Sequence, residues 1–255
     1  ARNCRLFVPF KVLLGLCGFC YPCVLLVHRA VGLSNGDIAW LQAWFGASFA
    51  PVLLVGGYLA DRWGRKRSLM VGALGSAIAW LLYGVAHASM DLAIAEMTLA
   101  LAIGAIIGAE HALIYDSLLA QHREAEHPSL RSRAYACANV TVGVAGVAGA
   151  ALALRSLEAP FLVGTVAACL AGVVAFFMSE PPRVHARRGT FFADMARLRC
   201  ELQRGSPALR RLIVVGALLV GISMGSMSLF SVAYTEMGIS TEWFGVLGLA
   251  VNGIA

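Results

Sequence analysis

Long uncharged apolar runs alternate with short polar segments along this chain. The complete runs lie near residues 10–28, 37–60, 68–88, 92–119, 133–154, 159–179 and 211–235. An eighth run begins near Glu242 and continues to the last residue, Ala255. About 20 apolar residues cross the hydrocarbon core of a bilayer as a helix, so the pattern predicts seven membrane-spanning helices and the start of an eighth.

The apolar residues within each run are continuous and do not alternate with polar ones. Because backbone amides inside a bilayer must be hydrogen-bonded within the protein, only helices and closed barrels can span it. The strands of a barrel would show alternation, which these runs lack. We therefore predict an all-α, polytopic membrane protein.

Prolines mark several of the expected helix boundaries. Pro160 stands at the start of the sixth run, and Pro181 and Pro182 follow its end. Proline suits the first turn of a helix and cannot continue one. Tyr21 and Pro22 lie near the far end of the first run, where the proline is expected to kink the helix.

One extended polar segment divides the runs into two groups. We predict a six-helix bundle over residues 1–180, a cytoplasmic loop over 181–210 and the beginning of a second bundle over 211–255. The last run is shorter than a membrane span, and the first residue is Ala1, not methionine. These two features predict that the chain is a piece of a longer protein.

The composition excludes a water-soluble globule. Hydrophobic residues make up 59% of the chain and charged residues 13%, with a mean hydropathy of +0.76. Soluble domains contain about 25% charged residues. The net charge of +6 could indicate a nucleic-acid partner, but the distribution of the cations along the chain indicates a membrane orientation instead.

The lysines and arginines gather on one side of the predicted membrane. When the loops are assigned to alternate sides, all of the 20 basic residues except Arg29 and Arg155 fall on the side of the N-terminus. The positive-inside rule then places the N-terminus in the cytoplasm. We expect a multi-pass protein of the bacterial inner membrane. We expect the cations to meet lipid headgroups, and we expect no nucleic-acid partner.

The short basic segment between the second and third runs carries the most specific pattern. Residues 57–67 read Gly-Tyr-Leu-Ala-Asp-Arg-Trp-Gly-Arg-Lys-Arg. The pattern Gly-x-Leu-Ala-Asp-Arg-x-Gly-Arg-Lys-Arg resembles the loop that joins the second and third helices of major facilitator superfamily transporters. The resemblance implies two six-helix bundles around a central pocket, transport of a small solute by alternating access, and a monomer.

In that family, the matching loop latches the N-terminal bundle to the C-terminal one at the cytoplasmic side. The resemblance assigns this role to Gly57, Asp61, Arg62, Gly64 and Arg65. From the residues alone, Asp61 is expected to cap the helix that follows and to pair with Arg65, four positions later. The alternative is that these charges only fix the orientation of the loop.

Among the complete runs, only the fourth carries acidic residues in its interior. Glu96, Glu110 and Asp116 lie there, with His111 beside Glu110. An ionisable group at membrane depth costs about 2.5–3.5 kcal/mol on insertion scales, so it usually faces a cavity or a partner. We predict Glu110, His111 and Asp116 as proton or substrate sites. A side chain that binds and releases a proton changes its charge, and this change can favour one of two conformations. We expect Glu96 to be solvated near the outer interface.

Each of these three sites has a structural alternative. Glu110 is equally suited to a buried ion pair, and His111 to a hydrogen bond between helices. Asp116 is expected to pair with one of three arginines at the inner surface, Arg65, Arg131 or Arg133.

The polar residues of the other runs predict a pocket wall, made of Tyr21, Gln42, Asn139 and Tyr234. Each could instead hydrogen-bond a neighbouring helix, a contact of about 0.6 kcal/mol on average. The small residues Gly104 and Gly108 predict close helix packing.

Two features expected of a drug–proton antiporter of this family are absent. Residues 90–121 contain no arginine, and the glycine-rich stretch at 142–149 contains no proline.

The chain offers no pattern for a cofactor, a metal or an enzyme. Cys17, Cys20 and Cys23 would suggest a metal site in a soluble loop, but within an apolar helix they are expected to act as small hydrophobes. There is no phosphate-binding glycine loop and no His-Glu-x-x-His sequence. A membrane enzyme built on Glu110, His111 and Asp116 would lack a nucleophile.

The resulting functional expectation is a secondary active, proton-coupled transporter of a small solute. Efflux of a drug or metabolite by proton antiport is the first interpretation. Uptake of a metabolite by proton symport, or a receptor or scaffold that keeps the fold without transport, remain as alternatives.

Overall fold

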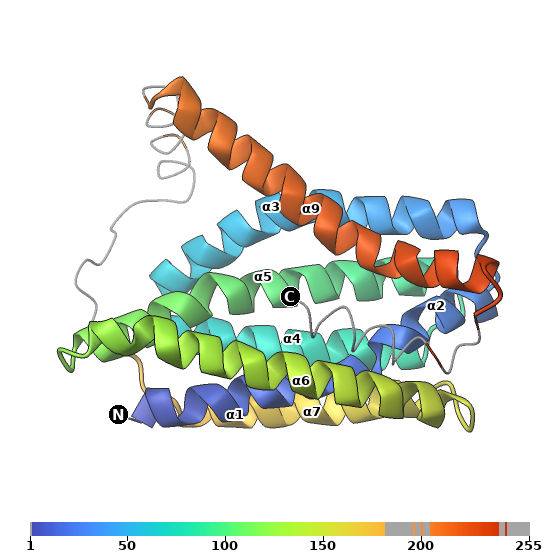
Figure 1. The fold of residues 1–255 in the computed structure, drawn as a ribbon, viewed down its shortest axis with the longest axis horizontal. Coiled ribbons are helices and arrows are strands. Elements are labelled where there is room, and N and C mark those ends of the chain that lie inside the picture. Colours follow the sequence, from blue (N-terminus) through green and yellow to red (C-terminus); the bar gives the residue numbers. More distant parts are fainter. Residues whose placement is uncertain (1, 182–195, 197–199, 201–204, 240–242, 244–255) are drawn as a thin grey trace.

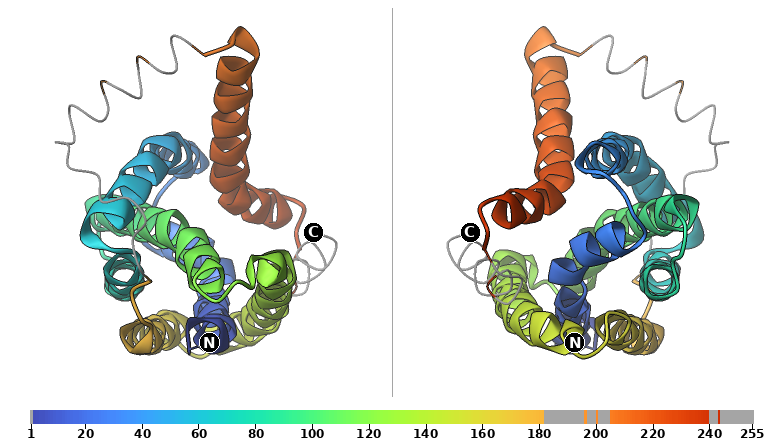
Figure 2. Two further views of the ribbon diagram at one scale, coloured as in Figure 1. Left: turned by 90° about the vertical axis from the view of Figure 1, so that its left-hand side faces the viewer. Right: turned by 90° about the vertical axis from the view of Figure 1, so that its right-hand side faces the viewer.

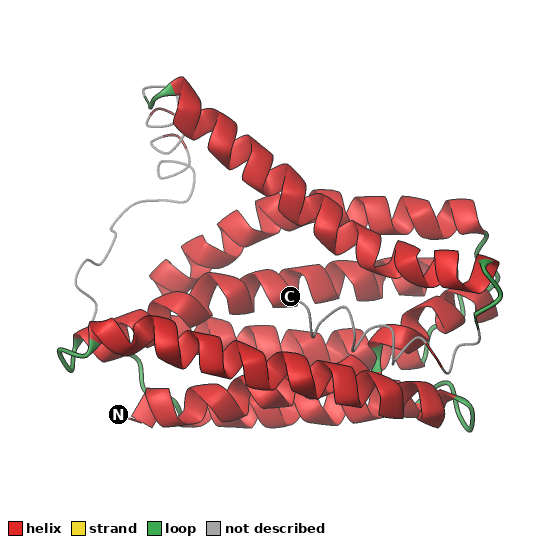
Figure 3. Ribbon diagram, viewed as in Figure 1, coloured by secondary structure: helices red, strands yellow, loops and turns green. Residues whose placement is uncertain are grey.

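A computed structural model describes residues 2–181, 196, 200, 205–239 and 243 (Figure 1). In these residues every regular element is a helix (Figure 3). The helices are α1 (Arg2–Leu16), η1 (Cys17–Phe19), α2 (Tyr21–Ala30), α3 (Asn35–Trp63), α4 (Arg65–Gly84), α5 (Ser89–Leu119), η2 (Glu124–Glu126), α6 (His127–Ala153), α7 (Ala159–Phe177) and α9 (Pro207–Glu236).

The all-α prediction is confirmed. Six helices of the described part are long and apolar enough to cross a membrane, with α1, η1 and α2 together forming the first. The region of the seventh predicted span is helical, as α9, but α9 is not one of these six helices. The start of the eighth, and most of the predicted loop over 181–210, lie outside the described residues.

The first span is interrupted near its middle, next to the proline that predicted a kink. The α-helix ends at Leu16, a short 3-10 turn follows, and α2 begins at Tyr21 with Pro22 as its second residue. Proline lacks the amide hydrogen of an interior helix residue, so a new helix start is the position where it fits.

Acidic side chains cap two helices at the end of the bundle where α2 ends. The Ser34 Oγ accepts the Asp37 N–H at 3.2 Å, and the Asp37 Oδ2 accepts the Ser34 N–H at 3.0 Å, which together make a capping box for α3. Asp91 in α5 accepts the backbone N–H groups of His87 and Ala88, each at 3.0 Å.

The spans run back and forth along one axis, so their ends form two faces (Figure 1). The basic end is defined here as the face with Arg2, Gly64 and Leu119, and the opposite end as the face with Ala30 and Gly84. In the packing, α4 contacts α5 and α7, α1 contacts α6 and α7, and α3 contacts α5 and α9. Seen along the axis, α9 lies beside α3 on the far side from α1 and α7 (Figure 2).

Glycines allow α3 and α5 to touch through their backbones. A Cβ on Gly108 would lie 2.5 Å from the backbone nitrogen of Gly57, and a Cβ on Gly104 would collide with Val52. Gly56 meets the backbone of Gly104 in the same way. Small residues four apart let helices approach closely, as the sequence pattern predicts here.

Two apolar clusters fill the interior, one toward each end. The cluster at the opposite end includes Trp80, Tyr83 and Phe161, whose rings pack on one another. The cluster at the basic end includes Phe7 and Phe10. Large apolar side chains are also exposed on the outside of α4, α5 and α7. An apolar exterior over a packed core is what a bilayer requires.

Candidate functional site

The charged residues of the bundle interior gather in three places along α5. Glu110 lies in the interior, Asp116 lies near the basic end, and Glu96 lies near the opposite end. Each contacts side chains from other helices, and the three groups differ in their partners.

Glu110 forms the interior group with Lys11 and Tyr135. Its side chain is 0% exposed. The Lys11 Nζ lies 3.0 Å from its Oε2, and the Tyr135 hydroxyl donates a hydrogen bond to its Oε1. These residues come from α5, α1 and α6, so one carboxylate joins three helices. The positive-inside count assigned Lys11 to the side of the N-terminus, but α1 spans Arg2–Leu16, so Lys11 lies within the first span.

The other basic side chains of this group pack against the ring of Tyr135. The Lys11 Nζ lies 4.1 Å from the ring centroid, and the Arg131 Cζ lies 5.6 Å from it. The His111 ring stacks on Tyr135 at 6.1 Å and 15°. Cations favour the face of an aromatic ring, so Tyr135 holds Lys11 through its ring and Glu110 through its hydroxyl.

His111 is the partly open member of the group. Its side chain is half-buried, and its Nε2 lies 3.8 Å from the Glu110 Oε1. Its Nδ1 is buried and has no hydrogen-bond partner among the described residues. The structure thus joins the two interior candidates, Glu110 and His111, and adds two partners that the sequence did not indicate. Neither Lys11 nor Tyr135 carries a local pattern that would have identified it.

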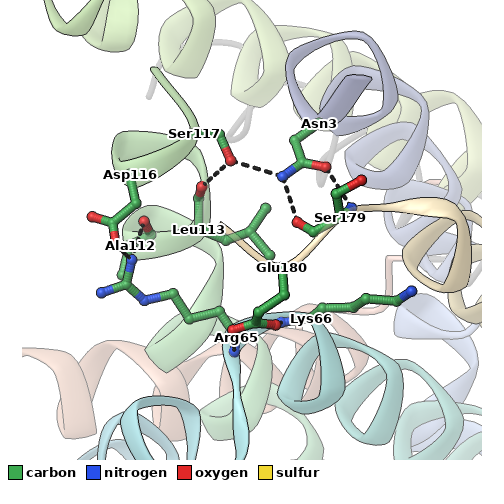
Figure 4. A network of polar contacts seen from close by, with 9 residues as sticks. All are labelled: Asn3, Arg65, Lys66, Ala112, Leu113, Asp116, Ser117, Ser179 and Glu180. Atoms are coloured by element: carbon green, nitrogen blue, oxygen red, sulfur yellow. Dashed lines mark hydrogen bonds and ion pairs between the residues drawn. The ribbon is translucent and has the colours of Figure 1, made fainter. Parts of the chain in front are cut away.

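Arg65 and Asp116 meet at the basic end (Figure 4). The guanidinium of Arg65 forms an ion pair with Asp116, and its Nη1 also donates to the carbonyl oxygen of Ala112 at 2.8 Å. Of the three arginines that the sequence left open for Asp116, the structure selects Arg65. The contact ties the first turn of α4 to the last turns of α5.

Glu180 caps α4 from the end of α7. Its two carboxylate oxygens accept the backbone N–H groups of Arg65 at 2.8 Å and Lys66 at 2.9 Å (Figure 4). A carboxylate at a helix N-terminus satisfies free amides and complements the helix dipole. Glu180 was not among the predicted site residues. The sequence does show an acidic residue just after a predicted helix at this end, a position from which it could cap a neighbouring helix.

The prediction that Asp61 caps the next helix and pairs with Arg65 was wrong. The structure has no eleven-residue loop: α3 continues to Trp63 and α4 starts at Arg65, so Gly64 alone lies between them. Gly64 has φ +114°, a conformation that favours glycine. Asp61 is therefore in the last turn of α3, where it is exposed and makes no hydrogen bond or ion pair with any described residue.

The other two members of the predicted latch also lie on α3. The Arg62 Nη1 donates to the Tyr58 hydroxyl at 2.7 Å, one turn earlier in the same helix. Gly57 lies against Gly108, and a Cβ added to Gly57 itself would meet nothing within 4 Å. Close packing between α3 and α5 thus requires the absence of a side chain at Gly108, but not at Gly57.

Asn3 completes the network at the basic end (Figure 4). Its Nδ2 donates to the Ser117 Oγ and to the Ser179 carbonyl oxygen, both at 2.7 Å. Its Oδ1 accepts the Ser179 N–H at 2.7 Å. The side chain is buried and joins the start of α1 to α5 and to the end of α7. Together with the contacts of Arg65 and Glu180, it fastens four helices at one end.

Glu96 is buried, contrary to the expectation that it is solvated. It is 4% exposed, and its Oε1 accepts a hydrogen bond from the Gln42 Nε2 at 2.6 Å. The His28 Nε2 lies 3.8 Å from the same oxygen. The reason is that side chains from three other helices lie against it, namely His28 on α2, Gln42 on α3 and Tyr83 on α4. Gln42, predicted as pocket wall, instead lies in the core against Glu96.

The remaining pocket-wall candidates lie on three different helices. Tyr21 on α2 is 45% exposed and meets Trp80 edge-on at 5.8 Å. Asn139 on α6 is half-buried. Tyr234 on α9 is partly buried and packs against the core cluster of the opposite end.

A cavity of about 750 Å³ opens at the opposite end. Its lining comes from the α2–α3 connection, from Asp37, Trp40 and Trp44 on α3, and from the start of α5. None of the predicted site residues lines it. Within the described residues, no group of three or more His, Cys, Asp or Glu side chains is arranged to hold a metal ion.

Comparison with known proteins places these features in a family context. Residues 12–255 match the family model described as Major Facilitator Superfamily. The puromycin resistance protein pur8 of Streptomyces alboniger is 40% identical over 60 residues, which are 24% of this chain and 12% of that protein. A probable actinorhodin transporter of Streptomyces coelicolor is 42% identical over 60 residues, 24% of this chain and 10% of that protein.

A solved structure matches over nearly the whole chain. The crystal structure of an auto-inhibited POT family peptide transporter aligns with a TM-score of 0.53 and 13% sequence identity. The alignment covers 97% of this chain and 53% of that one, so the chain spans about half the length of the transporter. At this identity, the match describes the fold.

Proposed function

Because the chain belongs to the major facilitator superfamily, we propose that it is part of a secondary active transporter that moves a small solute by alternating access. It is an integral, multi-pass membrane protein, with six helices suited to spanning the bilayer in its described part. The observation that carries the proposal is Glu110, a fully buried carboxylate bound by Lys11 and Tyr135 from two other helices.

Glu110 is the proposed proton carrier. While it is ionised, it compensates the charge of Lys11. When it binds a proton, Lys11 loses its partner and must find another, because an unpaired buried charge costs several kcal/mol. The protonated and ionised forms thus favour different arrangements of α1, α5 and α6, which is the property that couples a proton gradient to a conformational change.

The same exchange gives a solute a place to bind. A solute with an acceptor group can take the place of the carboxylate beside Lys11 once Glu110 is protonated. His111, half-buried beside Glu110, provides the accessible edge of this group. Tyr21, Asn139 and Tyr234 are proposed as further pocket-wall residues on the remaining helices, whereas the burial of Gln42 against Glu96 removes it from that set.

Efflux is the proposed direction. The two curated relatives are a puromycin resistance protein and a probable actinorhodin transporter, and both names fit export of a small organic compound. Antiport with protons would supply the free energy, since one charge moving across 100 mV is worth about 2.3 kcal/mol. The basic end would face the cytoplasm of the cell, with the protein acting as a monomer in the bacterial inner membrane.

The latch at the basic end is proposed to depend on Asp61. Asp61 is exposed, whereas Arg65 is committed to Asp116 and to α5. Arg65 therefore acts indirectly, by holding α4 against α5, while Asp61 contacts the second bundle. Gly64 supports this role by allowing the single-residue connection between α3 and α4. Gly57 and Arg62 are proposed as further members of the latch on the last turns of α3, where Arg62 hydrogen-bonds Tyr58.

Flux through the full-length protein tests the proposal. Inside-out vesicles carrying the protein are given labelled puromycin as the probe and an imposed proton gradient. We expect accumulation of the probe that a protonophore abolishes and that Glu110→Gln prevents. Flux of the probe in the opposite direction would support uptake by symport. Absence of flux for puromycin and for a panel of small organic solutes would favour the receptor or scaffold alternative.

A further inference from the structure

Near the opposite end of the bundle, a second buried carboxylate lies beside a buried histidine. Glu96 on α5 is 4% exposed, and His28 on α2 is 0% exposed. The His28 Nε2 is 3.8 Å from the Glu96 Oε1, a distance that suits an ion pair and exceeds a hydrogen bond. Neither ring nitrogen of His28 has a hydrogen-bond partner among the described residues.

None of the side chains described around Glu96 carries a permanent positive charge. From α3 it faces the Gln42 amide, which donates to Oε1 at 2.6 Å, and from α4 the hydroxyl of Tyr83. From α2 it faces His28, whose ring lies 6.2 Å from that of Tyr83, and Cys20 lies beyond Tyr83. None of these groups is a fixed cation.

Several other charged groups at this end have partners of their own. Asp37 and Asp91 cap α3 and α5. Arg29 hydrogen-bonds Asn35, which in turn donates to Glu236 at 2.8 Å. Glu96 therefore differs from Glu110, whose carboxylate has Lys11 at 3.0 Å.

We propose that Glu96 and His28 together bind one proton and form a second protonation site in the bundle. The proton resides either on the carboxyl group of Glu96 or on the imidazole of His28. In both forms the pair is electrically neutral, which is the state that an apolar interior favours. Gln42 and Tyr83 hold the carboxyl group in place, so that only the proton is exchanged.

The position of this site sets it apart from Glu110. Along α5, Glu96 and Glu110 are nearly four helical turns apart, about 21 Å, and therefore lie on nearly the same face of the helix. The second site is close to the opposite end, within reach of protons from that side. It is independent of the proposed transport function, because it concerns proton binding by the resting protein without a solute.

Infrared and nuclear magnetic resonance spectra of the full-length protein in lipid nanodiscs test the proposal. At neutral pH we expect the C=O stretching band of a buried, protonated carboxyl group, and Glu96→Gln should remove it. Glu158→Gln is the matched control, because Glu158 is exposed and should not contribute to that band. If the proton resides on the histidine, the band is absent and the ¹⁵N resonances of His28 report an imidazolium that His28→Gln removes.

The proposal is overturned if wild-type spectra show an ionised Glu96 together with a neutral His28 at neutral pH. Wild-type protein alone is sufficient for this result, provided that glutamate and histidine are isotope-labelled, so the test does not depend on the variants folding. A Glu110→Gln variant that loses flux yet keeps the Glu96 signal would separate this site from the proposed transport site. Loss of the signal in Glu110→Gln would contradict the assignment to Glu96.

Discussion

Lys11 and Glu110 form an ion pair, 3.0 Å long, between α1 and α5 in the interior of the helix bundle. The carboxylate is fully buried, and the lysine side chain is nearly so. Each charge therefore depends on the other, since removal of one partner from a buried pair costs about 3–5 kcal/mol.

The dependence of Lys11 and Glu110 on each other predicts a double-variant effect. Lys11→Met should lower the free energy of unfolding by about 3–5 kcal/mol, because it leaves Glu110 charged and unpaired. Lys11→Met combined with Glu110→Gln should recover most of that loss while remaining inactive. Unfolding in detergent measures both, and a double variant as unstable as Lys11→Met would argue against the pairing.

The exposed position of Asp61 predicts a loss of function without a loss of stability. Asp61→Asn should reduce flux, while its unfolding free energy stays within about 0.5 kcal/mol of the wild-type value, as is usual for exposed sites. Asp116→Asn is the matched comparison, because it removes the partner of Arg65 and should destabilise the protein. Normal flux in Asp61→Asn would remove Asp61 from the proposed latch.

The capping role of Glu180 predicts a graded effect on α4. Glu180→Ala should cost about 0.5–2 kcal/mol, the range for loss of a helix cap. Glu180→Gln keeps one acceptor oxygen and should cost less. Thermal unfolding in detergent compares these two variants with Glu158→Ala. Glu158 is an exposed glutamate just before the start of α7, at the opposite end from Glu180. Equal stability of all three variants would mean that Glu180 does not contribute as a cap.

The crossing of α3 and α5 predicts opposite outcomes at two neighbouring glycines. Gly108→Ala should destabilise the protein by about 1–3 kcal/mol, because its Cβ would press on the backbone of Gly57 and the helices would have to separate. Gly57→Ala should be tolerated, since nothing lies within 4 Å of its Cβ. Yield and thermal stability of the purified variants decide the question, and a stable Gly108→Ala would contradict such close packing.

The proposed orientation predicts the accessibility of the two ends. In a cysteine-free background, Arg155→Cys should react with a membrane-impermeant thiol reagent added to intact cells. Arg123→Cys should react only after the membrane is opened, because it lies at the basic end. The reverse labelling pattern would place the basic end outside the cell and contradict the positive-inside assignment.

The sequence alone was sufficient to predict the helices and the family. The lengths of the apolar runs predict the spans, six of which correspond to helices suited to crossing a membrane in the described residues. Pro22 marks the break in the first span, and Gly104 and Gly108 indicate a close helix contact. These features are local: a helix of about 20 apolar residues spans a bilayer whatever its neighbours are, and proline or glycine acts within its own turn.

Only the tertiary structure decided which charges meet. Arg65 pairs with Asp116 and leaves Asp61 exposed, Glu180 caps a helix more than 100 positions away, and Glu96 is buried by α2, α3 and α4. A sequence records the order of residues along each helix, but not the rotation of that helix or the identity of its neighbours. Because a buried charge must find its partner across those contacts, the partners of Glu110 and Glu96 followed from the packing alone.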